Sequence, residues 1–428
     1  MTLKTILSAA AARTASPSIS GLMKIALERP EIVSLAAGFV DQESLPTRAT
    51  AAALTEILGD ETAGKAALQY GTTVGDEALR EILVGRLEAQ HGVPAGRYRE
   101  VVPHVVMTTG SAQLIYLVGE ALLDPGDIVI VESPTYFVFL GPLETRGARA
   151  IRVATDDGGL RLDELERTLQ AIQSRGELGR VKLLYTVPEH SNPSGVSLAL
   201  DRRKPLLELM KRWSATAGRR IPILEDSAYH GLSYYGRPEA PSIWSMDREG
   251  ESVILARTFS KTFSPGLKLG YGVIPPSLIG TVLALKGNHD FGSSNLAQKL
   301  IREVLADGAY DRHVEGLRTM YARKLDAFLE ALDREFAAIR DRVSWTRPRG
   351  GLYVWMTLPD EVDTGFDGPL FQRCLDDGVI YVPGEYAFAP EPTPPPKNHM
   401  RLAFGVPDAP TLVEGARRLA GAVRATIG

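Results

Sequence analysis

Between residues 105 and 275, short apolar segments alternate with longer segments whose apolar residues recur at helical spacing. The segment 128–131, Ile-Val-Ile-Val, is continuous and β-branched, which is typical of a strand buried on both faces. Similar strands are expected at 181–187, 221–224 and 253–256, with helices at 111–123, 162–173 and 202–213. Strands that alternate with helices predict βαβ units, and therefore a largely parallel sheet covered by helices on both faces.

Beyond residue 295 the pattern changes to long helical stretches followed by short strands. Helices are expected at 296–305, 311–336 and 409–427, and strands at 351–358, 379–382 and 400–404. We therefore predict an α/β fold, with a three-layer α/β/α large domain around a mostly parallel sheet and a smaller α+β domain. Residues 1–45 are expected to form an N-terminal arm and part of the small domain, 46–300 the large domain and 301–428 the C-terminal small domain. The proline-rich segment 390–396 should be an exposed loop.

Composition excludes several classes of protein. The 428 residues carry 48 Lys and Arg against 52 Asp and Glu, a net charge of −4, which argues against a basic surface for nucleic acid. The single cysteine, Cys374, can form no intrachain disulfide or cysteine-based zinc site and is expected to be a small apolar residue in a helix. No segment approaches the ~18 apolar residues that span a membrane. Residues 1–15 loosely resemble a secretory signal, but the apolar part is short, so an N-terminal helix or arm and a cytoplasmic location are predicted.

Polar residues follow three of the predicted strands where each strand ends. Asn192 follows the strand at 181–187, Asp226 and Tyr229 follow the next, and Lys261 follows the third. The spacings of 226 − 192 = 34 and 261 − 226 = 35 residues would place them along one edge of the sheet, where parallel α/β folds bind ligands. These four side chains suit a cofactor with a pyridinium ring, a phenolate oxygen and an aldehyde, which is pyridoxal 5′-phosphate.

The segment from Thr258 to Tyr271, Thr-Phe-Ser-Lys-Thr-Phe-Ser-Pro-Gly-Leu-Lys-Leu-Gly-Tyr, carries the most specific resemblance. Together with Asn192-Pro193-Ser194-Gly195 and Asp226, it resembles the class I/II aminotransferases of fold type I. The branch it is most similar to holds the aminoadipate, kynurenine and aromatic aminotransferases, and the resemblance runs from about residue 16 to the C-terminus. It implies transfer of the amino group of an L-amino acid to a 2-oxo acid, with 2-oxoglutarate as the expected acceptor.

Chemistry and resemblance together assign roles to the strand-end residues. Lys261 would form a Schiff base with the cofactor aldehyde and then move a proton as a base. Asp226 would pair with the ring nitrogen and keep it protonated, which makes the ring an electron sink. Asn192 and Tyr229 would hydrogen-bond the 3-oxygen of the ring. We therefore expect Lys261, Asp226 and Tyr229 to be the catalytic residues.

A predicted helix that opens directly after Thr109 offers its backbone N–H groups to the cofactor phosphate. The resemblance implies that this phosphate site is formed by Ser111, Ala112, Thr258, Ser260 and Lys268. Many relatives carry glutamine in place of Ala112 and arginine in place of Lys268. Because lysine keeps the charge but loses the bidentate fork, weaker or looser phosphate anchoring is expected.

Further roles rest on the resemblance. Tyr136 matches the aromatic residue that stacks on the cofactor ring. Tyr70 matches a residue that reaches the phosphate of the neighbouring subunit, which implies a homodimer with shared active sites. Arg401 matches the arginine that grips the substrate α-carboxylate, with Asn192 beside it, and Gly38 matches a backbone segment that lies against the substrate.

Some alternatives stay open. The same cofactor chemistry serves lyases, decarboxylases and amino-acid synthases, and the fold also occurs as the effector module of transcription regulators. Regulators of that kind place a basic winged helix-turn-helix before the module, whereas only about fifteen residues precede the resemblance here. Glu189 and His190 beside Asn192 are expected to form a solvated loop, although they could tune the site or reach a substrate side chain.

Overall fold

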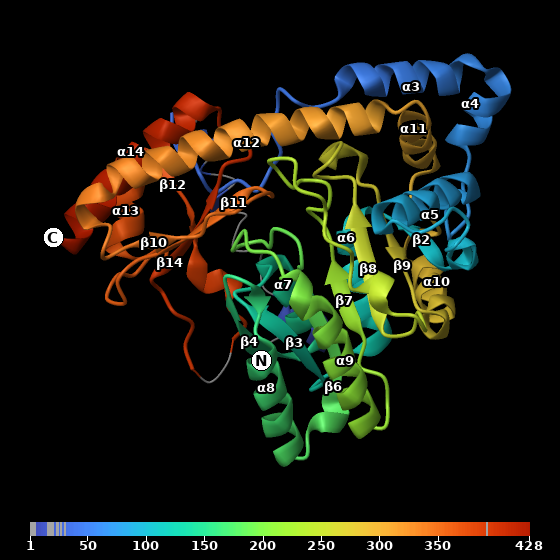
Figure 1. Cartoon of the computed structure of the whole chain (residues 1–428), viewed down its shortest axis with the longest axis horizontal. Helices are drawn as coiled ribbons and strands as arrows, with labels where there is room; N and C mark the ends of the chain where they lie inside the picture. The colour runs from blue at the N-terminus through green and yellow to red at the C-terminus, as the bar shows by residue number, and fades with distance from the viewer. Residues whose placement is uncertain (1–5, 15–20, 23–24, 26–27, 30, 391–392) are drawn as a thin grey trace.

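An eight-stranded sheet forms the centre of the larger part of the molecule, with strand order β2-β9-β8-β7-β6-β3-β4-β5 (Figure 1). The structure is a computed structural model, and it describes residues 6–14, 21–22, 25, 28–29, 31–390 and 393–428. Neighbouring strands among β3, β4, β6, β7 and β8 are parallel, while β9 is antiparallel to β2 and β8. The strands are β2 (Val105–Thr108), β3 (Ile128–Ser133), β4 (Arg149–Asp156), β5 (Gly159–Leu160), β6 (Val181–Thr186), β7 (Ile223–Asp226), β8 (Val253–Thr258) and β9 (Gly270–Val273).

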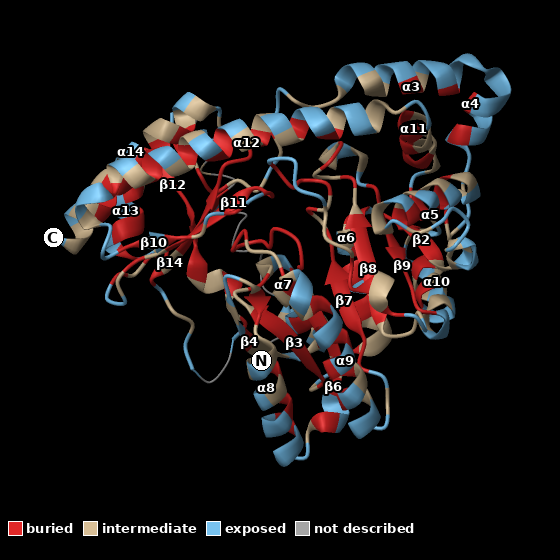
Figure 2. Ribbon diagram, viewed as in Figure 1, coloured by how far each residue is buried: buried red, intermediate tan, exposed pale blue. Residues whose placement is uncertain are grey.

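Alternation along the buried strands divides the core between the two faces of this sheet. On β3, Ile128 and Ile130 belong to one hydrophobic cluster, whereas Val129 and Val131 belong to the other. Each cluster also contains helices, so the sheet lies between two helical layers, and Figure 2 shows the strands buried and the outer helix faces exposed. One face packs against α6 (Gly110–Leu122), α7 (Phe137–Arg146) and α10 (Pro276–Asp290), and the other against α5 (Glu77–His91), α8 (Leu162–Ser174), α9 (Leu200–Thr216) and α11 (Asn295–Ala306). The predicted three-layer α/β fold is confirmed.

A four-stranded sheet of order β10-β11-β14-β13 forms the centre of the smaller part. The short strand β1 (Val33–Ser34) pairs with β12 (Val379–Ile380), which brings an N-terminal segment against the C-terminal part of the chain. Helix α12 (Ala309–Glu335) runs from the large part to the small one (Figure 1). The domain limits given above stay a prediction. The remaining elements are β10 (Ser344–Trp345), β11 (Tyr353–Thr357), β13 (Val382–Pro383), β14 (His399–Ala403), α13 (Pro369–Asp376) and α14 (Ala409–Ile427).

Most predicted elements are present within two or three residues of their expected ends, and Cys374 is buried in α13 as expected. Strand β4 was not predicted, because polar residues interrupt it, and neither was β9, because it contains two glycines. Part of the predicted N-terminal arm is the helix α1 (Ala9–Arg13), while residues 1–5, 15–20, 23–24, 26–27 and 30 of that arm lie outside the described residues, as do 391 and 392 of the proline-rich loop.

Among the described residues, no helix combines the length and the apolar composition that a membrane span requires. The cytoplasmic location stays a prediction.

Candidate active site

A cavity of about 340 Å³ opens at the carboxyl ends of β6, β7 and β8. Every site residue predicted from the sequence lines this cavity except Tyr70. The lining residues that had been predicted are Gly38, Ser111, Ala112, Tyr136, Asn192, Asp226, Tyr229, Thr258, Ser260, Lys261, Lys268 and Arg401. The ends of neighbouring parallel strands meet at this edge, which is why residues 34 and 35 positions apart in the sequence converge.

Lys261 lies just beyond the end of β8, in the turn that follows Thr258. Its Nζ donates a hydrogen bond to the carbonyl oxygen of Gly38, at 2.9 Å. In the part of the chain that the structure describes, no carboxylate forms an ion pair with Lys261. The amine is therefore held in the cavity by a single neutral acceptor, which it can leave at small cost.

Asp226 is the last residue of β7 and is buried. The hydroxyl of Tyr185 donates to its Oδ2 at 2.8 Å, whereas Oδ1 has no hydrogen-bond partner among the described residues. Burial raises the pKa of the Asp226 carboxyl to about 6, and the bond from Tyr185 opposes this rise only in part. A buried carboxylate oxygen without a partner is the group expected opposite a cationic N–H donor.

One end of the cavity is formed by the first turn of α6 and the turn that contains Ser260. Helix α6 begins at Gly110, whose φ of +69° favours glycine, and the side chain of its N-cap residue makes no capping hydrogen bond. Gly270 lies so close to this turn that a Cβ there would lie 2.9 Å from the backbone nitrogen of Ser111. The N–H groups of the first turn remain free to bind an anion. The Thr258 hydroxyl donates to Ser260 Oγ at 2.9 Å beside them.

Lys268 lines the same end of the cavity and follows the short 3₁₀ helix η4 (Pro265–Leu267). Its φ of +49° lies in the left-handed region, which is uncommon for a residue with a side chain. The described residues include no acidic group in an ion pair with Lys268, so its positive charge remains available to an anion in the cavity.

Arg401, on β14, lines the cavity and is buried. Its Nη1 donates to Asn192 Oδ1 at 3.0 Å, and its Nη2 donates to the carbonyl oxygen of Ala36 at 2.7 Å. The guanidinium lies 4.6 Å from the centre of the Tyr353 ring and 5.3 Å from that of Phe137. All of these partners are neutral groups, so they fix the orientation of the guanidinium without neutralising its charge.

Tyr353 is a site residue that the sequence did not reveal. Tyr229 donates a hydrogen bond to the Tyr353 hydroxyl at 3.1 Å, and a Cβ on Gly38 would lie 2.8 Å from that hydroxyl. Burial raises the pKa of Tyr229, so its hydroxyl keeps its proton at neutral pH. Tyr353 lies in β11, in the smaller sheet, where no nearby motif distinguishes it from a core tyrosine.

Tyr70 lies outside the cavity of its own chain. The residue is 82% exposed, and its ring meets the ring of Phe291 edge-on, with the ring centres 5.7 Å apart. Leu68 and Phe291 are also exposed. Tyr70 can therefore act at a cavity of this type only if that cavity belongs to another chain.

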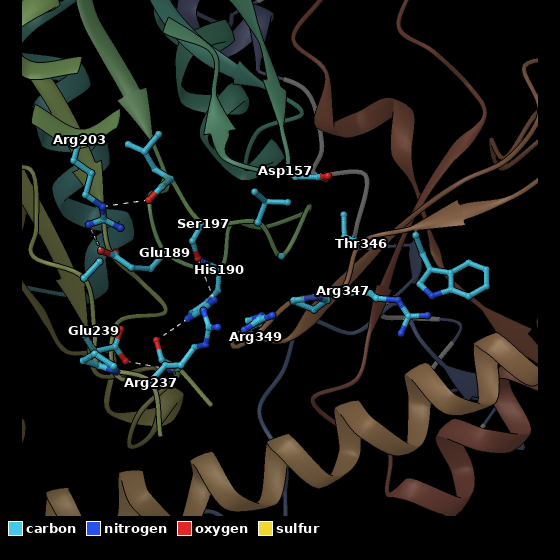
Figure 3. Close-up of a pocket in the computed structure, with 18 residues that line it drawn as sticks. Asp157, Glu189, His190, Ser197, Arg203, Arg237, Glu239, Thr346, Arg347 and Arg349 are labelled. Carbon is cyan, nitrogen blue, oxygen red and sulfur yellow. Dashed lines mark hydrogen bonds and ion pairs between the residues drawn. The ribbon is translucent and has the colours of Figure 1, made fainter. Parts of the chain in front are cut away.

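The prediction of a solvated loop at Glu189 and His190 is wrong, because both residues are buried. Figure 3 shows both among the side chains that line a cavity. Arg203 of α9 donates to Glu189 Oε1 at 3.0 Å, and His190 Nε2 lies 3.0 Å from the hydroxyl of Ser233. Burial lowers the pKa of His190 to about 4. Both residues line a separate cavity of about 590 Å³, so they do not contact the space beside Lys261.

Comparison with known proteins identifies relatives along nearly the whole chain. The family model described as aminotransferase class I and II matches residues 30–419. Aromatic-amino-acid aminotransferase 1 of Thermococcus litoralis is 34% identical over 95% of this chain and 91% of its own length. The crystal structure of Pyrococcus horikoshii kynurenine aminotransferase with PMP superposes with a TM-score of 0.88 and 34% identity, covering 99% of this chain and 98% of the other. That of the α-aminoadipate aminotransferase from Thermus thermophilus, complexed with N-(5′-phosphopyridoxyl)-L-leucine, gives a TM-score of 0.82 and 32% identity over 98% of both chains.

Proposed function

The chain belongs to the class I and II aminotransferases, and we propose from that premise that the 340 Å³ cavity is its active site. The protein is an aminotransferase that depends on pyridoxal phosphate and acts on amino acids and 2-oxo acids. The observation that carries the site assignment is the convergence of Lys261, Asp226 and Arg401 on one cavity. The finer roles that follow are proposals.

The cavity offers partners for both the ring nitrogen and the phosphate of pyridoxal phosphate. The unpartnered Oδ1 of Asp226 suits a protonated ring nitrogen, and the free N–H groups at Ser111 and Ala112, with Lys268, suit a phosphate. Tyr136 lines the cavity beside Asp226, where it can stack on the ring. The bound cofactor supplies the electron sink that makes the Cα–H bond of an amino acid acidic.

Three groups of the chain would act on the substrate. Lys261 would hold the cofactor through its amine and, once released, would carry the proton away from Cα. Arg401 would bind the α-carboxylate, with Asn192 fixing the orientation of the guanidinium. Tyr229 and Tyr353 keep their hydrogen-bonded hydroxyls at the wall of the cavity, where they would orient the ring oxygen.

The proposed amino donor rests on the substrates for which the relatives are named and on the apolar residues that line the cavity. The relatives are named for aromatic amino acids, kynurenine and aminoadipate, and Phe39, Phe137 and Val138 form an apolar part of the lining. We expect aromatic or long-chain L-amino acids as donors and 2-oxoglutarate as the acceptor. A panel of L-amino acids assayed with 2-oxoglutarate, by detection of glutamate and of the new 2-oxo acid, tests this. If amino acids are consumed but no amino group reaches the acceptor, a lyase or decarboxylase reaction replaces the proposal.

Replacing Arg401 with glutamine is expected to raise KM for both the amino acid and the 2-oxo acid by roughly 10²-fold or more, because a charged partner of the carboxylate is lost. Cofactor binding should be retained, since the contacts of Arg401 are with residues outside the proposed phosphate site. Steady-state kinetics with both substrates measures this. The KM values of Arg401→Lys should lie between those of the native enzyme and those of Arg401→Gln, because lysine keeps the charge but cannot form two parallel hydrogen bonds. An unchanged KM for either substrate would contradict the carboxylate assignment.

Replacing Lys268 with arginine is expected to slow cofactor dissociation by roughly three- to tenfold, because a guanidinium can form two parallel hydrogen bonds to a phosphate. The left-handed backbone at this position strains both side chains alike, so the comparison isolates the phosphate contact. Loss of the cofactor during dialysis of the holoenzyme measures the rate, with Lys268→Ala as the variant that should lose it fastest. Dissociation that is equally fast in all three forms would remove Lys268 from the phosphate site.

We propose that the protein is a homodimer in which Tyr70 acts at the partner's cavity. Support comes from the exposure of Tyr70, Leu68 and Phe291, and from helices α3 (Thr47–Gly59) and α4 (Glu61–Leu68), which Figure 2 shows largely exposed at one end of the molecule. Such an apolar surface is expected to be covered in an oligomer.

Mixing two inactive variants tests this arrangement. Tyr70→Ala and Lys261→Ala homodimers are each expected to be impaired, but a mixed dimer would contain one cavity with both native residues. A 1:1 mixture, allowed to exchange subunits, should regain about a quarter of the native activity. If Tyr70 serves its own chain, the mixed dimer has no intact site and no activity returns.

A further inference from the structure

A further cavity, of about 400 Å³, adjoins the active-site cavity at Thr258, at the ends of β7 and β8. The alternation of the strands separates the two spaces: Asp226 and Thr258 line the active site, whereas their chain neighbours Ser227 and Arg257 line the 400 Å³ cavity. Thr258 lines both. The remaining walls come from α5, β9, the first turn of α12 and the segment after β7 that contains His230, Pro238 and Glu239. A ligand in this space would therefore lie one residue away from two groups proposed to bind the cofactor.

Arg257 is the unusual feature of this cavity. The residue is only 6% exposed, its Nε and Nη2 have no hydrogen-bond partner, and it forms no ion pair within the described part of the chain. The hydroxyl of Ser227, which is also buried, has no partner either. Burying an uncompensated guanidinium is costly, so an anion is the expected neighbour of such a group.

The cavity also holds an acceptor without a donor. Glu239 Oε1 accepts hydrogen bonds from the backbone N–H groups of Gly231 and Ser233, both at 3.1 Å, but its Oε2 is buried without a hydrogen-bond partner. Glu239 and Arg257 do not pair with each other, and Arg86, the other lining arginine, is paired with Asp311. Glu239 Oε1 also lies 3.6 Å from Nη2 of Arg318, and Oε2 lies 3.9 Å from Nδ1 of His230, which is beyond hydrogen-bond distance. The cavity therefore presents one cationic group without an ion pair and one carboxylate oxygen without a hydrogen bond.

We propose that this cavity binds a free α-amino acid as a second ligand, separate from the substrate. The carboxylate of the ligand would pair with Arg257 and Ser227, and its ammonium group would donate to Glu239 Oε2. The side chain would lie against the apolar walls formed by Leu83, Leu87, Tyr271 and Tyr310. A simple carboxylic or 2-oxo acid would satisfy Arg257 but leave Glu239 without a donor, so the arrangement selects zwitterions.

Binding of 2-aminoisobutyric acid to the holoenzyme tests the proposal by calorimetry. This amino acid has no hydrogen on Cα, so it cannot be transaminated, and the Arg401→Gln variant removes the proposed substrate carboxylate site. The Arg401→Gln holoenzyme is expected to bind about one molecule per chain. Adding Arg257→Gln should weaken binding at least tenfold, whereas adding Arg237→Gln, a change to an exposed arginine of the 590 Å³ cavity, should have no effect.

Isobutyrate, which lacks the amino group, is the matched ligand and should bind at least tenfold more weakly than 2-aminoisobutyrate. The proposal would be overturned by equal binding of the two ligands or by equal binding with and without Arg257. It would also be overturned if nothing binds to the Arg401→Gln holoenzyme, in which case the cavity holds only water. If Arg257→Gln does not fold, Arg257→Lys, which keeps the charge and loses the fork, should still weaken binding severalfold. Because the readout is binding of a ligand that has no Cα hydrogen, it is independent of whether the protein transaminates.

Discussion

Replacing Lys261 with alanine is expected to lower the turnover of transamination by about 10⁴-fold or more. Among the described residues, Lys261 is the only lysine besides Lys268 that lines the active-site cavity, and it is the group proposed to move the proton from Cα. The loss should appear in kcat with every amino donor, because proton transfer is common to all of them. Single-turnover absorbance measurements with a good donor would separate this loss from substrate binding.

The same variant should also lose its covalent link to the cofactor. Borohydride reduction of the native holoenzyme, followed by peptide mass spectrometry, is expected to find the modification on Lys261 alone, and none on the variant. Lys65→Ala is the matched control, since Lys65 is an exposed lysine paired with Glu61, and it should behave like the native protein. Persistent transamination or a cofactor bound to another lysine in the Lys261→Ala protein would refute the assignment.

Replacing Asp226 with asparagine is expected to reduce kcat by roughly 10²–10³-fold, because a buried charge opposite the protonated ring nitrogen is lost. Asparagine is nearly the same size, so the change isolates the charge. Burial raises the pKa of the Asp226 carboxyl to about 6, so the group is protonated below that pH and ionised above it. Affinity of the native apoenzyme for the cofactor should therefore fall as the pH drops below about 6.

The pH dependence of cofactor binding provides a control for the prediction on Asp226. Cofactor binding measured by fluorescence from pH 5 to 8 should lose this transition in Asp226→Asn, which has no carboxyl to titrate. Tyr185→Phe removes the hydrogen bond to Oδ2 and leaves the charge, so it should move the transition to higher pH while keeping most of the activity. A transition near pH 6 that persists in Asp226→Asn would belong to another group.

Much of the fold could be predicted because the buried strands carry their own signal. The segment of β3 is apolar at every position from 128 to 131, since both of its faces are covered, and the residues that follow β6, β7 and β8 are polar at positions that only a parallel sheet brings together. The sequence could place Lys261 and Asp226 at the same cavity because both residues are local to these strand ends.

The features that the sequence did not reveal depend on contacts between distant segments. Glu189 is buried because Arg203, on α9, supplies the compensating charge, and no local pattern in the sequence predicts such a pair. Tyr353 reaches the site only because the smaller sheet lies against the larger one. Arg257 could have been noticed as a charged residue at the end of an apolar strand, but only the cavity shows that its charge has no partner.

The carbonyl groups of Ala36 and Gly38 have a consequence for how the protein is made. They accept hydrogen bonds from Arg401 and Lys261, which lie 365 and 223 residues later in the chain. The segment that contains Ala36 and Gly38 is therefore synthesised long before its partners. Contacts so distant in sequence form slowly, and domains fold as they are synthesised. The nascent chain can therefore complete the layers around the large sheet well before Arg401, the residue proposed to bind the substrate carboxylate, is in place. We expect substrate binding to be the last property that the new protein acquires.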